Sequence, residues 1–173
     1  MIWQYYITIS VLLLAGLNSA GLAIYAWRRR SAPWTTAYAF MMAIISWWVF
    51  TYLLQLVSTG LNAKIFWDDV QSAASNTMGA NFLMLSLTYT HRSHWLTPRN
   101  IGLLMIVPTA ATLLAWTNPY HHLFRASETL YQAGPFMLPQ FEVGAGQWGL
   151  LIYSYSVIAV GFGFLIQAAI RWN

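Results

Sequence analysis

The sequence has no cysteine and is poor in charge. Its 173 residues include eight Lys or Arg and four Asp or Glu, so 7% of the side chains are charged, whereas soluble domains carry roughly 25%. So few charged side chains cannot cover a soluble domain of this length, which indicates a protein surrounded by lipid. Without cysteine the chain has no disulfide, no thiolate metal site and no cysteine nucleophile.

Several chemical motifs are missing as well. No HExxH, GxSxG or glycine-rich phosphate loop occurs, so nothing in these residues indicates a catalytic site. No Asp, Glu, Lys or Arg lies near the centre of an apolar segment, which argues against a proton pump or an ion-coupled transporter. The basic residues are scattered over short connections, which argues against nucleic-acid binding.

Apolar and aromatic side chains are abundant. Hydrophobic residues make up 58% of the chain, and its ten Trp and ten Tyr are of the kind that collects at membrane interfaces. A helix needs about 20 apolar residues to cross a bilayer, and backbone groups in hydrocarbon must be satisfied within the segment. The sequence therefore predicts an all-α membrane protein, with a single domain over 1–173. Its five expected transmembrane helices cover about 5–27, 34–58, 65–90, 101–117 and 147–170.

Charge is distributed unevenly among the connections. If the five helices alternate, six Lys or Arg fall on one side of the membrane and two on the other. Positive residues concentrate on the cytoplasmic side, so we expect the N-terminus outside and the C-terminus in the cytoplasm. The outer side holds Lys64 and Arg125 with the four acidic residues. The six on the cytoplasmic side are Arg28, Arg29, Arg30, Arg92, Arg99 and Arg171.

The third segment carries a polar stripe at helical spacing, and the fifth repeats the pattern less strongly. Small and hydroxyl residues on such a stripe let helices approach closely and hydrogen-bond. The same stripe is also suited to form one wall of a polar cavity that opens outward; both interpretations remain open here. The stripe of the third segment is Asp69, Ser72, Asn76, Gly79, Ser86 and Thr90, and that of the fifth is Gly149, Tyr153, Ser156, Gly163 and Gln167.

The connection 118–146 is 29 residues long, and loops of that length usually have a function or their own structure. The TNP sequence at 117–119 ends the fourth helix, because proline cannot continue it. Two β-prone runs, TLYQ and QFEV, flank the Gly-Pro pair at 134–135 and predict a small β-hairpin at the outer end. Asp68 and Asp69 lie near the expected start of the third helix, where we interpret them as an N-terminal cap.

The four histidines lie outside the centres of the expected helices. A haem or pigment site in a membrane bundle needs inward-facing histidines within the spans. His91 and His94 lie at the cytoplasmic end of the third segment, and His121 and His122 follow the fourth. We interpret both pairs as fastening loops through hydrogen bonds, and we expect no metal or cofactor. pH sensing by His121 or His122 is an alternative, because histidine titrates near neutrality.

Three stretches together resemble a known family. They are SLTYTHRSHWLTPRN at 86–100, LLMIVPTAATLLAWTNPYHHLF at 103–124 and GAGQWGLLIYSY at 144–155. They are similar to the seven-transmembrane N-terminal sensor region of bacterial and archaeal histidine kinases, and the TNPxHHLF element is the most specific. The resemblance implies a signal-input domain in a bacterial cytoplasmic membrane. It also implies a longer protein, with two more helices, a cytoplasmic output module such as a kinase, and a homodimeric state.

These observations lead to a sensor hypothesis. We expect a small amphipathic ligand to bind in an outward-facing cavity between the third, fourth and fifth helices, roofed by 118–146, and to shift the helix arrangement. Two alternatives remain open: a non-catalytic subunit of a larger membrane complex, and a haem- or pigment-binding membrane protein. Besides membrane lipid, this ligand and a second copy of the full-length protein, no other partner is indicated. The candidate ligand-binding residues are Asn76, Asn81, Trp116, Asn118, His121, His122, Trp148, Tyr153 and Tyr155.

Overall fold

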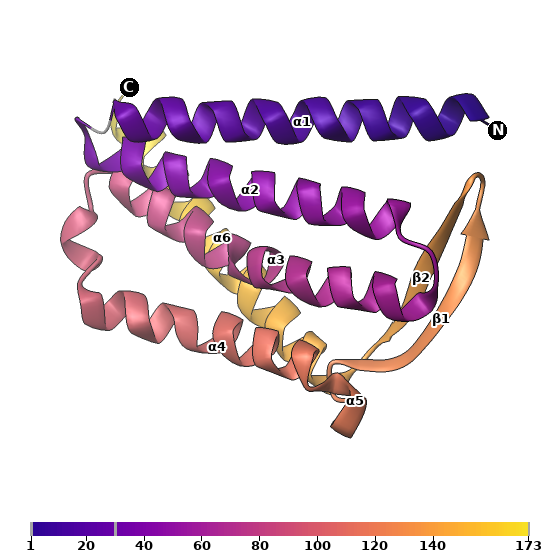
Figure 1. Ribbon diagram of the computed structural model, residues 1–173. Helices are drawn as coiled ribbons and strands as arrows, with labels where there is room; N and C mark the ends of the chain where they lie inside the picture. Colours follow the sequence, from indigo (N-terminus) through magenta and orange to yellow (C-terminus); the bar gives the residue numbers. More distant parts are fainter. Residues whose placement is uncertain (1, 30, 173) are drawn as a thin grey trace.

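Five long helices run back and forth along one axis in the computed structural model, which describes residues 2–29 and 31–172 (Figure 1). A 3₁₀ turn, η1, and a short helix with two strands occupy the longer connections. The helices match the expected segments to within four residues at each end; Arg30 lies outside the described residues. The elements are α1 (Ile2–Arg28), α2 (Pro33–Val57), α3 (Leu61–Tyr89), η1 (Ser93–Trp95), α4 (Pro98–Trp116), α5 (Asn118–His121), β1 (Arg125–Ala133), β2 (Phe136–Val143) and α6 (Ala145–Trp172).

Four of the described helices are long and apolar enough to cross a membrane. The fifth, α3, is long enough with 29 residues, but its polar side chains keep it out of this set. The crossing of the membrane by α3 therefore stays a prediction. The four candidate spans are Trp3–Arg28, Trp34–Val57, Pro98–Trp116 and Ala145–Arg171.

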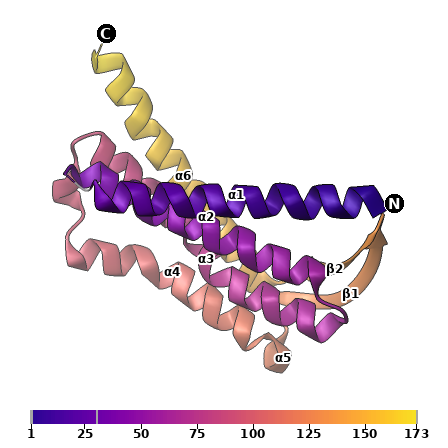
Figure 2. The ribbon, with the colours of Figure 1, turned by 45° about the horizontal axis from the view of Figure 1, so that its top comes forward.

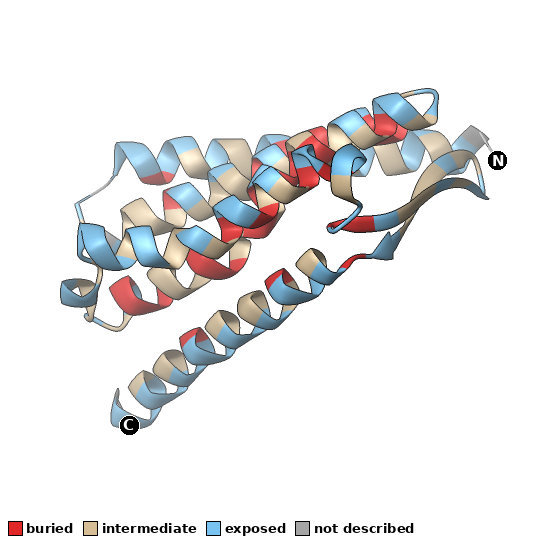
Figure 3. Cartoon of the chain, turned by 90° about the horizontal axis from the view of Figure 1, so that it is seen from below, coloured by how far each residue is buried: buried red, intermediate tan, exposed pale blue. Residues whose placement is uncertain are grey.

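The helix α3 lies at the centre of the bundle. It contacts α2, α4 and α6, whereas α1 packs chiefly on α2. The C-terminal end of α6 projects beyond the other helices (Figure 2). Colouring by burial shows buried residues gathered along α3, while α6 is mostly exposed (Figure 3). Most of the buried residues of α3 are polar, including Ser72, Asn76 and Ser86, so its polar stripe faces the protein rather than lipid.

Two glycines let α3 and α6 approach each other closely. A methyl group on Gly79 would lie 3.2 Å from the carbonyl oxygen of Ser154, and one on Gly161 would lie 2.9 Å from the ring of Phe82. Small residues at such contacts are typical of helix packing in membranes. The packing interpretation of the stripe therefore holds at Gly79, where the two helices touch.

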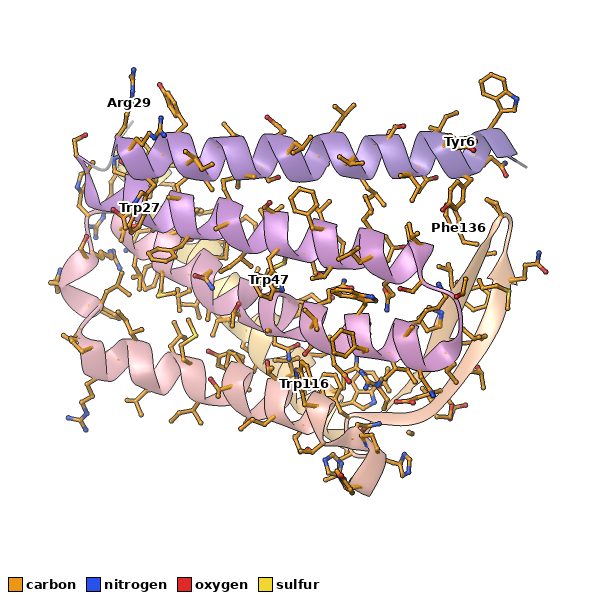
Figure 4. The ribbon with its side chains drawn as sticks, viewed as in Figure 1. Tyr6, Trp27, Arg29, Trp47, Trp116 and Phe136 are labelled. Carbon is orange, nitrogen blue, oxygen red and sulfur yellow. The ribbon has the colours of Figure 1, made fainter. Side chains whose placement is uncertain are left out.

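The alternation of the helices separates the charges onto two ends (Figures 1 and 4). One end, which we call the hairpin end, has the start of α1, the α2–α3 connection and the β1–β2 hairpin, with Lys64, Arg125 and the four acidic residues. We call the opposite end the arginine end. It holds Arg28, Arg29, Arg92, Arg99 and Arg171.

The two strands form an antiparallel hairpin, which confirms the prediction for the connection 118–146. Ala133 pairs with Phe136 around the Gly-Pro turn. Gly134 there has φ +60°, as the first position of a type II′ turn requires. The hairpin crosses the end of the bundle towards α1 and carries Phe136 there (Figure 4). The ring of Phe136 stacks on that of Tyr5 with 5.2 Å between centroids.

Candidate functional site

One buried arginine organises the hairpin end. Arg125 begins β1, is 1% exposed, and binds three carboxylates. Its Nη1 lies 2.9 Å from Asp68 Oδ2 and its Nη2 lies 2.7 Å from Asp69 Oδ1, both on α3. Its Nε lies 2.9 Å from Glu128 Oε1 on β1. The guanidinium also lies over the ring of Phe141 on β2. Arg125 therefore joins the hairpin to α3, and we call Arg125, Asp68, Asp69 and Glu128 the arginine cluster.

The arginine cluster holds one positive formal charge against three negative ones. Burial disfavours the charge of Arg125, but its hydrogen bond to Asp69 and the surrounding carboxylates outweigh burial and raise its pKa. The interpretation of Asp68 and Asp69 as an N-terminal cap is wrong. The helix begins at Leu61, so the two aspartates lie about two turns inside it and turn towards Arg125 instead.

Lys64 is the other buried basic residue of this end, at 1% exposed. Its Nζ donates to the carbonyl oxygens of Gln55, at 2.8 Å, and Leu56, at 3.3 Å. These carbonyls lie in the last turn of α2, where a cation compensates the partial negative charge of the helix end. The Gln55 side chain in turn donates to Asp68 Oδ1 at 3.1 Å, which links α2 to the arginine cluster.

Asn118 fixes the path of the chain from α4 to β1. Its Oδ1 accepts from the backbone N–H groups of Phe124 and Arg125, both at 2.9 Å. Its Nδ2 donates to the carbonyl oxygen of Arg125 at 2.9 Å and to Glu128 Oε1 at 3.3 Å. The side chain is 1% exposed, so it serves as a buried bracket that positions Arg125.

The two adjacent histidines hold the same turn. The backbone N–H of Leu123 donates to His121 Nδ1 at 3.0 Å, and His121 Nε2 lies 2.9 Å from Thr117 Oγ1. The Thr117 hydroxyl already donates to the carbonyl oxygen of Leu113, so its oxygen can accept from His121 Nε2. His122 ends α5 in the left-handed region, with φ 53°. His121 thus has the loop-fastening role expected from the sequence.

A proline and a tyrosine join α4 to α6. Pro108 lies inside α4 and has no N–H to donate to the carbonyl of Leu104, four residues earlier. The hydroxyl of Tyr153 on α6 donates to that carbonyl. In hydrocarbon a freed backbone group needs such a partner. Tyr153 therefore satisfies the backbone at the proline and ties the two helices together.

A cavity of about 360 Å³ lies between α3 and α6 beside the arginine cluster. Asp68, which binds Arg125, is also part of its wall. Among the described residues, the Oε1 atoms of two other wall residues, Gln71 and Gln147, are buried with no hydrogen-bond partner. A concave site lined by apolar groups with a few polar ones is what a small ligand needs.

A comparison with known families gives the class of the protein. The family model described as the N-terminal 7TM region of histidine kinase matches residues 11–173. The chain belongs to this family. It is a membrane sensor region of a histidine kinase, in agreement with the resemblance of its motifs. No curated protein and no solved structure matches the chain.

The cavity of this sensor region includes two of the nine candidate ligand-binding residues. Asn76 and Tyr155 lie in its wall, which comes from α3, α6 and Phe124. In the part of the chain that the structure describes, α4 supplies no wall residue, so the predicted placement between three helices is corrected to two. Asn76 still reaches α4, because its Nδ2 donates to Thr112 Oγ1 at 3.1 Å.

The other seven candidates lie away from the cavity of the sensor region. Asn118, His121 and Tyr153 make the structural contacts given above, and His122 ends α5. The ring of Trp116 contacts Phe66, and Asn81 borders a smaller cavity between α2, α3 and α4. Trp148 is 58% exposed on α6. The described residues contain no group of three or more His, Asp or Glu suited to hold a metal ion.

The structure adds residues that the sequence did not single out as a site, chiefly Arg125, Gln71 and Gln147. An arginine on the outer side with Glu128 three positions later was the available signal for a local ion pair. The two glutamines had no such signal. Their importance comes from the way α3 and α6 pack, which leaves their side chains at the same cavity.

Proposed function

We propose that the chain is the signal-input part of a receptor in the bacterial cytoplasmic membrane. A small amphipathic ligand binds in the cavity between α3 and α6, and the resulting helix rearrangement passes to a cytoplasmic output module. In this proposal the complete receptor has two further helices and acts as a homodimer. The proposal is carried by a cavity that shares Asp68 with the arginine cluster, in a histidine-kinase sensor region.

The contacts of α3 provide a path for such a signal. A ligand that binds Asp68 weakens the ion pair between Asp68 and Arg125. The hairpin, which carries Arg125, then shifts relative to α3. At the arginine end, Arg92 follows α3, donates to Gln167 on α6 and lies over the ring of Phe164. A shift of α3 against α6 would therefore change the contacts of Asp68 at the hairpin end and those of Arg92 at the arginine end.

Filling the cavity tests the sensor proposal. We expect Leu151→Trp, in the cavity wall, to hold the complete receptor in one output state. Its autophosphorylation rate in membrane vesicles should change by at least about fivefold, the lower range for coupled sites. The matched control is Ile152→Trp, because Ile152 is the next residue on α6 and is 68% exposed. Equal rates for the two variants would count against a signalling role of the cavity.

We further propose that the hairpin end faces the outside and the arginine end the cytoplasm. The separation of five arginines from the four acidic residues supports this orientation. Because the chain has no cysteine, a single introduced thiol reports its side without background. We expect a membrane-impermeant maleimide to label Thr129→Cys on the hairpin in intact cells, and Ser31→Cys only after lysis. The reverse pattern would invert the proposed topology.

A further inference from the structure

We infer that the cavity between α3 and α6 takes an amphipathic amine, with its protonated amino group at Asp68 and its apolar part along α6. This inference rests on the proposed function and names the chemical class of the ligand. It follows from the charge of the wall, the hydrogen bonds its side chains already make, and the distribution of its apolar residues.

The charge around the cavity is negative. Asp68 is the charged residue in its wall, and the arginine cluster to which Asp68 belongs holds one positive charge against three negative ones. The other basic residue nearby, Lys64, is occupied by the carbonyl oxygens at the end of α2. A carboxylate ligand would therefore meet repulsion in this cavity, whereas a cation would be attracted.

On the α3 side of the wall, two polar side chains use hydrogens within the protein, and Gln71 has a free acceptor. The Ser72 hydroxyl donates to the carbonyl oxygen of Asp69 at 2.7 Å, and Asn76 Nδ2 donates to Thr112. Gln71 is 9% exposed, lines the cavity, and has an Oε1 with no partner among the described residues. An unpaired buried carbonyl is unfavourable, and this second observation, independent of the acidic residues, points to a ligand that donates hydrogen bonds.

Apolar side chains form another part of the wall and suit the rest of an amphipathic molecule. Leu150, Leu151 and Ile158 on α6 and Met78 on α3 line it. The wall on α3 extends from residue 68 to residue 79, or about 16 Å at 1.5 Å per residue, so Met78 lies deeper along α3 than Asp68. The cavity thus has its carboxylate near the hairpin end of α3, with apolar side chains among the polar ones deeper in the bundle.

The test uses the chain in nanodiscs of phosphatidylcholine and three probes of equal length: octylamine, octanol and octanoate. Binding is measured by equilibrium dialysis, with empty nanodiscs subtracted to remove partitioning into lipid. We expect one saturable site for octylamine, with a Kd at least tenfold lower than for octanol or octanoate. Saturable binding of octanol or octanoate as tight as that of octylamine overturns the inference, and so does the absence of saturable octylamine binding.

Two paired variants distinguish a loss of ligand binding in the cavity from a general loss of structure around Arg125. Asp68→Asn and Asp69→Asn each remove one carboxylate that binds Arg125. Asp68 lines the cavity, whereas Asp69 does not. Octylamine affinity should fall at least tenfold in Asp68→Asn and less than threefold in Asp69→Asn. Equal losses in the two variants would overturn the assignment of the amino group to Asp68.

Glutamine variants supply a readout that a purely structural role would not give. Gln71→Leu removes an unpartnered oxygen, so we expect it to weaken octylamine binding about tenfold without lowering the unfolding midpoint of the protein. The matched control is Gln140→Leu on the exposed face of the hairpin. If Gln71→Leu binds octylamine like the control, the amine site is wrong, while the Leu151→Trp test continues to report on the proposed function separately.

Discussion

Replacement of Arg125 by methionine is expected to lower the free energy of unfolding by about 3–5 kcal/mol, the range for removing one partner of a buried ion pair. The arginine is 1% exposed and satisfies three carboxylates from two elements at once. Methionine fills similar space but leaves Asp68, Asp69 and Glu128 facing one another without a cation. The measurement is unfolding by increasing mole fraction of SDS in mixed micelles, followed by near-ultraviolet circular dichroism.

Two companion variants make the Arg125 result specific. Arg99→Met changes an exposed arginine at the arginine end, and its free energy of unfolding should stay within about 0.5 kcal/mol of the unchanged protein. A triple variant combines Arg125→Met with Asp68→Asn and Asp69→Asn. It lacks two of the three carboxylates that have lost their cation, so it should recover part of the lost free energy of unfolding. If Arg125→Met unfolds at the same SDS fraction as Arg99→Met, the arginine cluster does not hold the hairpin end together.

The helices were predictable because each forms a long run of mostly uncharged residues between short connections. Every long helix begins and ends within four residues of the expected position. The hairpin was predictable from two β-prone runs around a Gly-Pro pair, since the turn needs the positive φ that Gly134 adopts. These features depend on residues close together in the chain, which is why local patterns were sufficient.

The arginine cluster was not predictable in the same way. Asp68 and Asp69 lie 57 and 56 positions before Arg125, so no local spacing relates them. The expected helix start at residue 65 also placed the aspartates at a helix terminus, where capping is the ordinary role. The additional turn at the start of α3 moves them inside the helix and makes them available to Arg125.

The role of Tyr153 shows how two visible signals need the fold to be combined. The sequence showed a proline inside the fourth helix and a tyrosine on the polar stripe of the fifth. Which carbonyl the proline frees follows from the chain alone, but only the packing of α6 on α4 shows that the Tyr153 hydroxyl reaches Leu104. Tyr153, a candidate ligand-binding residue, therefore has a contact that joins two helices.

The bracket formed by Asn118 leads to the second large effect. We expect Asn118→Ala to lower the free energy of unfolding by about 3 kcal/mol, because it leaves two buried backbone N–H groups without partners, each costing about 1–3 kcal/mol. The same change frees the carbonyl of Arg125 and one contact of Glu128. The arginine cluster should therefore loosen together with the turn.

Hydrogen exchange at single residues is the direct measurement for Asn118→Ala. The amides of Phe124 and Arg125 should exchange at least tenfold faster in the variant, while amides in the middle of α2 should be less affected, since local opening does not require the whole bundle to unfold. The matched control is Asn100→Ala, because Asn100 is exposed and its side chain makes one bond, to the carbonyl of Trp95. Unchanged protection of Phe124 and Arg125 in Asn118→Ala would mean that the hairpin is held by the arginine cluster without the bracket.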